Sequence, residues 1–191
     1  MASGERVLMD RPAVEETLAE LARTVHEAAP ADEGLMVVGI RRRGVELAHR
    51  IAARVGELAG RHVDTGSLDI TLYRDDFAQV GPRPVIGTTE IPGEITDRRV
   101  VIVDDVLHTG RTVRAAMDEL ADFGRPRRIE LCVLVDRGGR ELPVQPDYVG
   151  RRVEVDPGWE VAVSVPEQDD ELSVRLVRAA EPAGEAAEGG A

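Results

Sequence analysis

The sequence predicts an α/β fold in which a mostly parallel sheet is flanked by helices. Two short apolar runs, residues 35–40 and 100–103, have the length of buried strands, and each is followed by a segment with helical spacing of apolar residues. A third apolar run, residues 129–135, follows the second of these helices. Repeated strand–helix–strand units make successive strands parallel and place the helices on the faces of the sheet.

Composition is consistent with one globular domain, which we expect over residues 1–178. The chain has 191 residues, with 24 Lys+Arg against 36 Asp+Glu, so its formal net charge is −12. This balance argues against a general polyanion binder, because such binding depends on a basic surface. All the basic residues apart from His are Arg, and a local Arg cluster could still grip one phosphorylated ligand.

Two further features bear on location and redox chemistry. No run approaches 18 apolar residues, and the first residues lack a basic segment followed by an apolar one, so we expect a cytoplasmic protein with no membrane contact. The single cysteine, Cys132, excludes an internal disulfide and a cysteine zinc cluster. Its place in an apolar strand predicts a core position.

The amino-terminal half predicts two helices. Residues 1–8 are expected to be a loose start. Asp10 with Pro12 is a helix-start signal, and apolar spacing extends that helix over residues 12–29. After the strand at 35–40, a second helix runs from Val45 and closes at Gly60.

The remaining segments are shorter. The sequence predicts a strand over 67–73, a long loop or hairpin arm over 74–98, a helix ending before Gly124, short strands near 161–165 and 172–177, and a solvated tail over 179–191. The tail contains only Ala, Gly, Glu and Pro, which cannot bury enough apolar area to offset the entropy of ordering.

The strongest chemical signal follows the strand at 100–103. Asp104 and Asp105 stand at the carboxyl end of that strand, where α/β sheets bind ligands. Two neighbouring carboxylates can accept hydrogen bonds from a pair of vicinal hydroxyls. The turn Thr109–Thr112 then presents backbone N–H groups at a helix amino terminus, which is an anion site. One loop would thus hold a sugar by its diol and its phosphate, unless the acidic pair only caps the helix.

Three segments together resemble the bacterial PyrR family of type I phosphoribosyltransferases. They are Leu68–Asp76, Val103–Arg114 and Val135–Pro143, and the similarity runs from about residue 7 to 165. The resemblance implies the type I phosphoribosyltransferase fold, with a small hood over about 136–165 and a flexible arm over about 74–98. It also implies uracil phosphoribosyltransferase activity, in which phosphoribosyl pyrophosphate (PRPP) and uracil give uridine monophosphate (UMP) and pyrophosphate.

The resemblance assigns roles to residues that match the family's motifs. Asp104, Asp105 and Arg74 would be catalytic, and Asp136, Arg137 and Val161 would line the base and nucleotide pocket. The residues expected to bind PRPP are Arg42, Arg43, Asp104, Asp105, Val106, Leu107, His108, Thr109, Gly110, Arg111 and Thr112. Mg²⁺ is the expected cofactor, held mainly through the substrate rather than by a protein metal site.

The resemblance also implies a regulatory role. We expect UMP-responsive binding to the messenger leader of pyrimidine genes, with Arg140 and Arg151 among the RNA contacts, and a homo-oligomer of two or more chains. Two alternatives stay open: a phosphoribosyltransferase without an RNA role, and a purine enzyme of the hypoxanthine type. The chain departs from its relatives at His108, usually Tyr, at Gly139, often His, and over 151–157, which puts the base preference in question.

Overall fold

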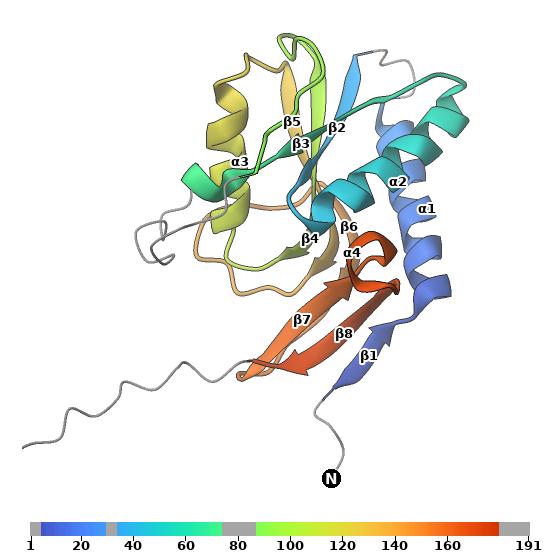
Figure 1. Ribbon diagram of the computed structural model, residues 1–191, viewed down its shortest axis with the longest axis vertical. Helices are drawn as coiled ribbons and strands as arrows, with labels where there is room; N and C mark the ends of the chain where they lie inside the picture. Colours follow the sequence, from blue (N-terminus) through green and yellow to red (C-terminus); the bar gives the residue numbers. More distant parts are fainter. Residues whose placement is uncertain (1–4, 30–33, 74–86, 180–191) are drawn as a thin grey trace, which may run out of the picture.

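The computed structural model describes residues 5–29, 34–73 and 87–179. A five-stranded parallel sheet with the order β3-β2-β4-β5-β6 forms the centre, and a separate antiparallel sheet with the order β1-β8-β7 lies beside it (Figure 1). The central strands are β2 Leu35–Ile40, β3 Asp64–Leu68, β4 Arg99–Leu107, β5 Arg128–Asp136 and β6 Tyr148–Arg152. The strands of the second sheet are β1 Arg6–Met9, β7 Trp159–Ser164 and β8 Ser173–Arg178. The α/β prediction is confirmed.

Helices cover both faces of the central sheet. The helices are α1 Arg11–Ala28, α2 Arg43–Ala59, α3 Arg111–Ala121 and the short α4 Pro166–Asp169, with a 3-10 turn η1 at Ile70–Tyr73. In Figure 1, α3 lies on one side of the sheet and α1 with α2 on the other. Alternate residues of one strand serve the two faces: Val101 and Val103 pack towards α1 and α2, whereas Val100 and Ile102 pack towards α3.

The predicted start signal of α1 and the predicted stop of α2 are confirmed, whereas α2 begins at Arg43, two residues before the predicted Val45. The Asp10 side chain accepts a hydrogen bond of 3.1 Å from the backbone N–H of Ala13, and so caps α1. Helix α2 ends at Gly60, which has a left-handed φ of 66°. Cys132 is fully buried, and burial raises the pKa of its thiol to about 12, which confirms the predicted core position.

Two local predictions are wrong, and two elements were not predicted. The strand expected over 67–73 ends at Leu68, because the Asp69 carboxylate accepts hydrogen bonds from the backbone and the hydroxyl of Thr71 and turns the chain into η1. The expected loose start contains β1, which pairs with β8. Strand β6 was not predicted at all, and neither was α4.

Two predicted segments lie largely outside the described residues. Of the arm expected over 74–98, residues 87–98 are described. They contain no helix or strand, and Glu90 forms an isolated β-bridge with Ser67. Of the tail expected over 179–191, residue 179 alone is described. Across the described ranges, no helix combines the length and the apolar character needed to cross a bilayer.

Candidate active site

A cleft of about 1300 Å³ opens at the carboxyl ends of the central strands. Its walls come from the loop after β2, the end of β4, the start of α3 and α4. Residues 65–71 and, from the described part of the arm, residues 87–92 also contribute. The predicted residues that line it are Arg42, Arg43, Asp104, Asp105, Val106 and Thr112. Residues far apart in the sequence therefore meet where the sheet topology predicts a ligand site.

Asp104 and Asp105 form the floor of the cleft but have different environments. Asp104 is only 6% exposed, and its carboxylate accepts a hydrogen bond of 3.0 Å from the backbone N–H of Asp105. Burial, together with the charge of Asp105, raises the pKa of Asp104 well above its ordinary value. Asp105 is half-buried and lines the cleft beside Asp104. Both belong to β4 itself, which runs four residues beyond the predicted strand.

The turn that follows β4 has the features of an anion site. Gly110 caps α3 with a left-handed φ of 91° and has no side chain to bond to the first turn. The first backbone N–H of the helix, that of Arg111, donates a hydrogen bond of 3.3 Å to the Thr109 hydroxyl. Thr109 accepts two backbone hydrogen bonds through its carbonyl, of 3.0 Å from Glu141 and 3.1 Å from Leu142. The Arg111 guanidinium forms an ion pair of 2.6 Å with Glu141. The turn is thus fixed from the hood side, while its helix terminus remains available to a phosphate.

The loop Arg41–Gly44 lies directly against β4. A Cβ atom at Gly44 would stand 2.6 Å from the carbonyl oxygen of Val103, so only glycine allows this approach. The Arg41 guanidinium donates a hydrogen bond of 3.2 Å to the Ser67 hydroxyl. The backbone N–H of Arg41 donates to the carbonyl of Leu68 at 2.9 Å. Three consecutive Arg side chains therefore stand at one wall of the cleft, as expected of a loop that receives a diphosphate.

Arg43 has a protein partner that the sequence did not reveal. Its Nε and Nη2 atoms each donate a hydrogen bond of 3.0 Å to the carboxylate of Asp169 in α4. This bidentate pair raises the pKa of Arg43 and lowers that of Asp169.

The hood residues stand beside the cleft rather than in its wall. Asp136 is 8% exposed, and its carboxylate accepts from the backbone N–H of Gly138 at 3.0 Å and from Arg140 at 2.8 Å. Arg137 donates a hydrogen bond of 3.1 Å to the carbonyl of Trp159 in β7. Neither these residues nor Val161, which packs against the main core, are among those that line the cleft.

Arg140, one of the two residues expected to contact RNA, forms hydrogen bonds within the hood and to the turn after β4. Besides Asp136, it donates to the carbonyl oxygens of Val144 at 3.0 Å and His108 at 2.9 Å. Arg151, by contrast, is exposed and donates a hydrogen bond of 2.6 Å to the carbonyl of Leu8. Arg140 is therefore placed to hold the hood against the phosphate turn.

Two residues that depart from the family pattern, His108 and Gly139, lie against each other in the structure. A Cβ atom at residue 139 would lie 2.7 Å from Nε2 of His108, so Gly139 leaves the space that the imidazole occupies. Partial burial, with the charges of Arg137 and Arg140 nearby, lowers the pKa of His108. A neutral imidazole thus stands between the phosphate turn and the hood.

Other predicted residues are placed as follows. Leu107 is buried in the core beneath the turn, and Arg74 lies outside the described residues. Trp159 packs under the guanidinium of Arg178, 4.5 Å from the ring centroid.

Sequence reasoning missed the polar network at the root of the arm. The Asp69 backbone N–H donates to the Thr89 hydroxyl at 2.9 Å, and that hydroxyl contacts the buried carboxylate of Glu119 in α3. Burial raises the pKa of Glu119. The Asp69–Thr89 and Thr89–Glu119 contacts join residues that are 20 and 30 positions apart in the sequence. No local sequence pattern encodes such contacts.

Comparison with known proteins assigns the family. The chain is 51% identical over 169 residues to the Bifunctional protein PyrR of Thermus thermophilus, which covers 88% of this chain and 93% of the relative. The Bifunctional protein PyrR of Pelotomaculum thermopropionicum is 45% identical over 181 residues, 95% of this chain and 100% of the relative. The chain belongs to the PyrR family. Residues 7–171 also match the phosphoribosyl transferase domain family.

Solved structures support the fold of this PyrR-family chain. A hypoxanthine phosphoribosyltransferase of Staphylococcus aureus superposes with a TM-score of 0.67 at 18% identity, covering 91% of this chain and 92% of that one. The Trypanosoma cruzi hypoxanthine phosphoribosyltransferase in complex with IMP gives a TM-score of 0.67 at 15% identity, covering 93% and 92%. The type I phosphoribosyltransferase fold expected from the sequence is confirmed, and at this identity the likeness concerns the fold alone.

Proposed function

We propose that this protein transfers the phosphoribosyl group of PRPP to uracil, giving UMP and pyrophosphate. The observation that carries the proposal is the meeting, in one cleft, of the Asp104–Asp105 pair, the amino terminus of α3 and the Arg41–Arg43 wall. These are receptors for a sugar diol, a phosphate and a diphosphate, the three parts of PRPP.

The arrangement accounts for the chemistry without a covalent intermediate. When C1 of the ribose loses pyrophosphate, positive charge develops on the sugar ring and negative charge on the leaving group. The carboxylates of Asp104 and Asp105 orient the ribose hydroxyls and stabilise the cationic sugar. Arg42 and Arg43 receive the leaving diphosphate, and the uracil nitrogen attacks the opposite face of C1. Catalysis then rests on positioning and fixed charges.

Mg²⁺ is the cofactor we propose. Among the described residues, no group of three or more His, Cys, Asp or Glu side chains is placed to hold a metal ion. Two carboxylates at the floor of a cleft fit a hard cation that keeps oxygen ligands from its substrate. Asp104 and Asp105 would stand beside it, and the ion would supply charge neutralisation to the diphosphate of PRPP.

Base specificity decides between this proposal and the purine alternative. We expect UMP to form from PRPP, Mg²⁺ and uracil, with much slower turnover of hypoxanthine or guanine in parallel reactions. Equal or faster turnover of either purine would overturn the uracil assignment while leaving the phosphoribosyl transfer intact.

We also propose the regulatory role that the family resemblance implies, namely UMP-responsive binding to leader RNA of pyrimidine genes. Five exposed Arg residues of β5, β6 and the segment before β5 lie in two groups: Arg125, Arg127 and Arg128 near the amino end of β5, and Arg151 and Arg152 at the carboxyl end of β6. Strands β5 and β6 are parallel and pair Asp136 with Arg152, so the two groups stand at opposite ends of this pair. Arg151 and Arg152, nearer the cleft, suit a nucleotide-sensitive contact.

A gel shift tests this role. We expect leader RNA of a pyrimidine gene to shift more strongly with UMP, and the shift to be lost steeply with added salt. The variant Arg151→Glu/Arg152→Glu should abolish it, whereas Arg127→Glu/Arg128→Glu should weaken it less. Absence of any UMP-dependent shift at low salt would leave the protein as an enzyme only.

A further inference from the structure

Helix α4 brings a carboxylate to the diphosphate wall of the cleft. Arg43 is the first residue of α2, and Asp169 is the last residue of α4, in the connection between β7 and β8. Both oxygens of Asp169 accept from the Arg43 guanidinium, which leaves the Nη1 amino group without a protein partner among the described residues. Arg43 still lines the cleft, so Nη1 is the donor that a diphosphate could meet.

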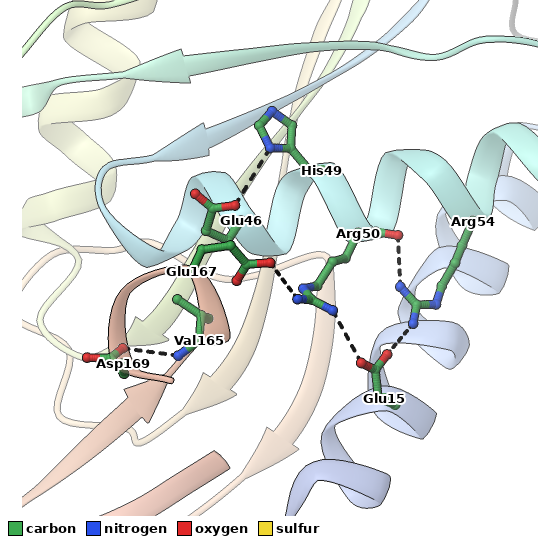
Figure 2. Close-up of polar contacts among 8 residues, drawn as sticks. All are labelled: Glu15, Glu46, His49, Arg50, Arg54, Val165, Glu167 and Asp169. Carbon is green, nitrogen blue, oxygen red and sulfur yellow. Dashed lines mark hydrogen bonds and ion pairs between the residues drawn. The ribbon is translucent and has the colours of Figure 1, made fainter. Parts of the chain in front are cut away.

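The position of Asp169 is fixed by its surroundings. Its Oδ2 atom also accepts a hydrogen bond of 3.0 Å from the backbone N–H of Val165, which closes the α4 turn (Figure 2). A second Arg of α2, Arg50, forms an ion pair of 2.6 Å with Glu167 of the same short helix. Arg50 also reaches Glu15 of α1 at 3.2 Å, and Arg54 contacts the same Glu15 carboxylate (Figure 2). Helix α4 is thus held to α2 by two ion pairs, and Arg50 in turn links α2 to Glu15 of α1.

Arg43 has a second carboxylate within electrostatic reach. The charge of Asp105 contributes to raising the pKa of Arg43, although no hydrogen bond joins the two side chains. Without Asp169, the guanidinium would be drawn towards Asp105 on the floor of the cleft. That movement would take the cation away from the diphosphate wall and neutralise the carboxylate proposed to hold the ribose diol.

We propose that Asp169 is a positioning residue of this site: it holds Arg43 at the diphosphate wall, with Nη1 directed to the ligand, and keeps the guanidinium away from Asp105. The inference rests on the proposed phosphoribosyl transfer and adds α4 to its machinery. The Arg43–Asp169 ion pair would have the same geometry if it served only to fasten α4 to α2. The test therefore has to separate positioning of Arg43 from fastening of α4.

The chain offers a matched control. Glu167 lies two residues before Asp169 in α4 and also pairs with an Arg of α2, but that Arg does not line the cleft. Asp169→Asn removes the bidentate charge pair while its remaining oxygen can still accept from Val165. Glu167→Gln removes a fastening of the same kind. A fastening role predicts similar effects of the two variants on activity, and a positioning role predicts that they differ.

Steady-state kinetics with PRPP and uracil give the readout. We expect Asp169→Asn to raise KM for PRPP about tenfold, the size of one lost charge-assisted hydrogen bond, with kcat and the KM for uracil changed much less. Asp169→Glu should restore part of the loss, and Glu167→Gln should match the wild type. Equal effects of Asp169→Asn and Glu167→Gln, or a lower KM for PRPP in Asp169→Asn, would overturn the proposal.

A double-mutant cycle tests whether the effect passes through Arg43. In an Arg43→Gln background, Asp169→Asn should cause no further rise in KM for PRPP, and an additive rise would contradict the proposal. If Asp169→Asn loses its fold, Arg43→Lys replaces it, because Lys keeps the charge but cannot form two parallel bonds. The same rise is then expected, and an unchanged KM would overturn the inference.

Failure of the proposed function has a different signature. If the wild type forms no UMP, the transfer reaction itself is refuted, and calorimetric titration with pyrophosphate and Mg²⁺ still compares the variants. Weaker pyrophosphate binding in Asp169→Asn than in Glu167→Gln would support the positioning role without any turnover. Equal binding would overturn it.

Discussion

Asp104 and Asp105 are neighbours in sequence, but the fold gives them separate tasks. Successive residues of a strand point to opposite sides, and here the first carboxylate is buried while the second is half-buried in the cleft. A pair that only capped α3 would accept hydrogen bonds from its first turn. Instead, the two carboxylates bond to the backbone N–H groups of Asp105 and Val106, at 3.0 and 2.9 Å.

Loss of the exposed carboxylate should slow catalysis. We expect Asp105→Asn to lower kcat/KM for UMP formation by roughly ten- to a thousandfold, the range for removing a preorganised polar contact to the transition state. The cleft lies at the surface, so the thermal unfolding midpoint should change little. A normally active Asp104→Asn/Asp105→Asn double variant would show that neither carboxylate takes part in the reaction.

Asp104 should lower the stability of the ligand-free protein at neutral pH. Its pKa is raised in the folded state, so the folded protein binds this proton more tightly than the unfolded chain does. Stability is therefore lost as the pH rises from the ordinary value of 3.8 through the raised one. We expect Asp104→Asn to raise the Tm at neutral pH by about 2–4 °C, which corresponds to about 1 kcal/mol for a chain of this size.

Thermal unfolding followed at several pH values checks this expectation. The gain in Tm should shrink as the pH falls to 3.8 and below, because the wild-type carboxyl is protonated in both states only below its ordinary pKa of 3.8. An unchanged or lower Tm of Asp104→Asn at neutral pH would contradict the assigned cost of burial.

At the scale of elements, the Arg140 side chain adds to the contacts that hold the hood against the turn Thr109–Thr112. Arg140 bonds to the carbonyl of His108 in the turn, to the carbonyl of Val144 and to Asp136 at the end of β5. Its side chain is only 15% exposed. A glutamate at position 140 would place a second negative charge against Asp136, so such a variant would disturb the site itself rather than report on RNA binding.

Removal of this tie should impair catalysis. We expect Arg140→Ala to lower kcat/KM for uracil transfer about tenfold, because the turn and the hood lose one of the contacts that join them and Asp136 loses a buried ion pair. Arg151→Ala is the matched control, since Arg151 is exposed and should leave the transfer rate unchanged. Wild-type kinetics in Arg140→Ala would refute the positioning role of Arg140.

The elements show which parts of the fold a sequence can predict. Long amphipathic helices and apolar strands were predicted correctly, because their periodicity is contained in one segment. Residues 67–73 were predicted wrongly because their β-branched and aromatic residues favour a strand, whereas the Asp69 side chain turns the backbone into η1. Strands β1 and β6 are short; β1 depends on pairing with β8 near the other end of the chain, and β6 is an edge strand that, among the described strands, pairs only with β5.

The same distinction applies to the site. Residues 104–112 could be predicted as a ligand loop because the pattern is contiguous. Asp169 is 126 residues from Arg43, and only the packing of α4 on α2 brings them together. The inward turn of Arg140 depends likewise on carbonyl groups that local sequence does not place.

At the scale of the whole molecule, two contacts link the two sheets beside the cleft. The parallel sheet supplies the residues proposed for ribose and diphosphate, Arg137 after β5 bonds to Trp159 of β7, and Arg43 of α2 bonds to Asp169 in the connection between β7 and β8. Deep in the main sheet, Arg99 and Glu130 form a buried ion pair of 2.8 Å, to which the Tyr148 hydroxyl also bonds. Removing one partner of such a pair is far more damaging than replacing both.

The buried thiol of Cys132 provides a natural probe of global opening. It lies in β5 between the two helical layers, and its raised pKa of about 12 keeps it protonated at neutral pH. A thiol reagent can reach this sulfur only when the sheet comes apart, so its labelling rate records how often the whole domain opens. We expect slow modification in native buffer and complete modification of one thiol per chain in denaturant.

Because the chain has a single cysteine, the rate of thiol labelling can be measured at Cys132 without engineering the sequence. PRPP with Mg²⁺ should slow the labelling further, as any ligand that binds only the folded state does, in proportion to its concentration relative to its Kd. Substrate affinity could then be measured for variants that catalyse nothing. Rapid labelling of the native protein would mean that β5 opens locally, independently of the rest of the fold.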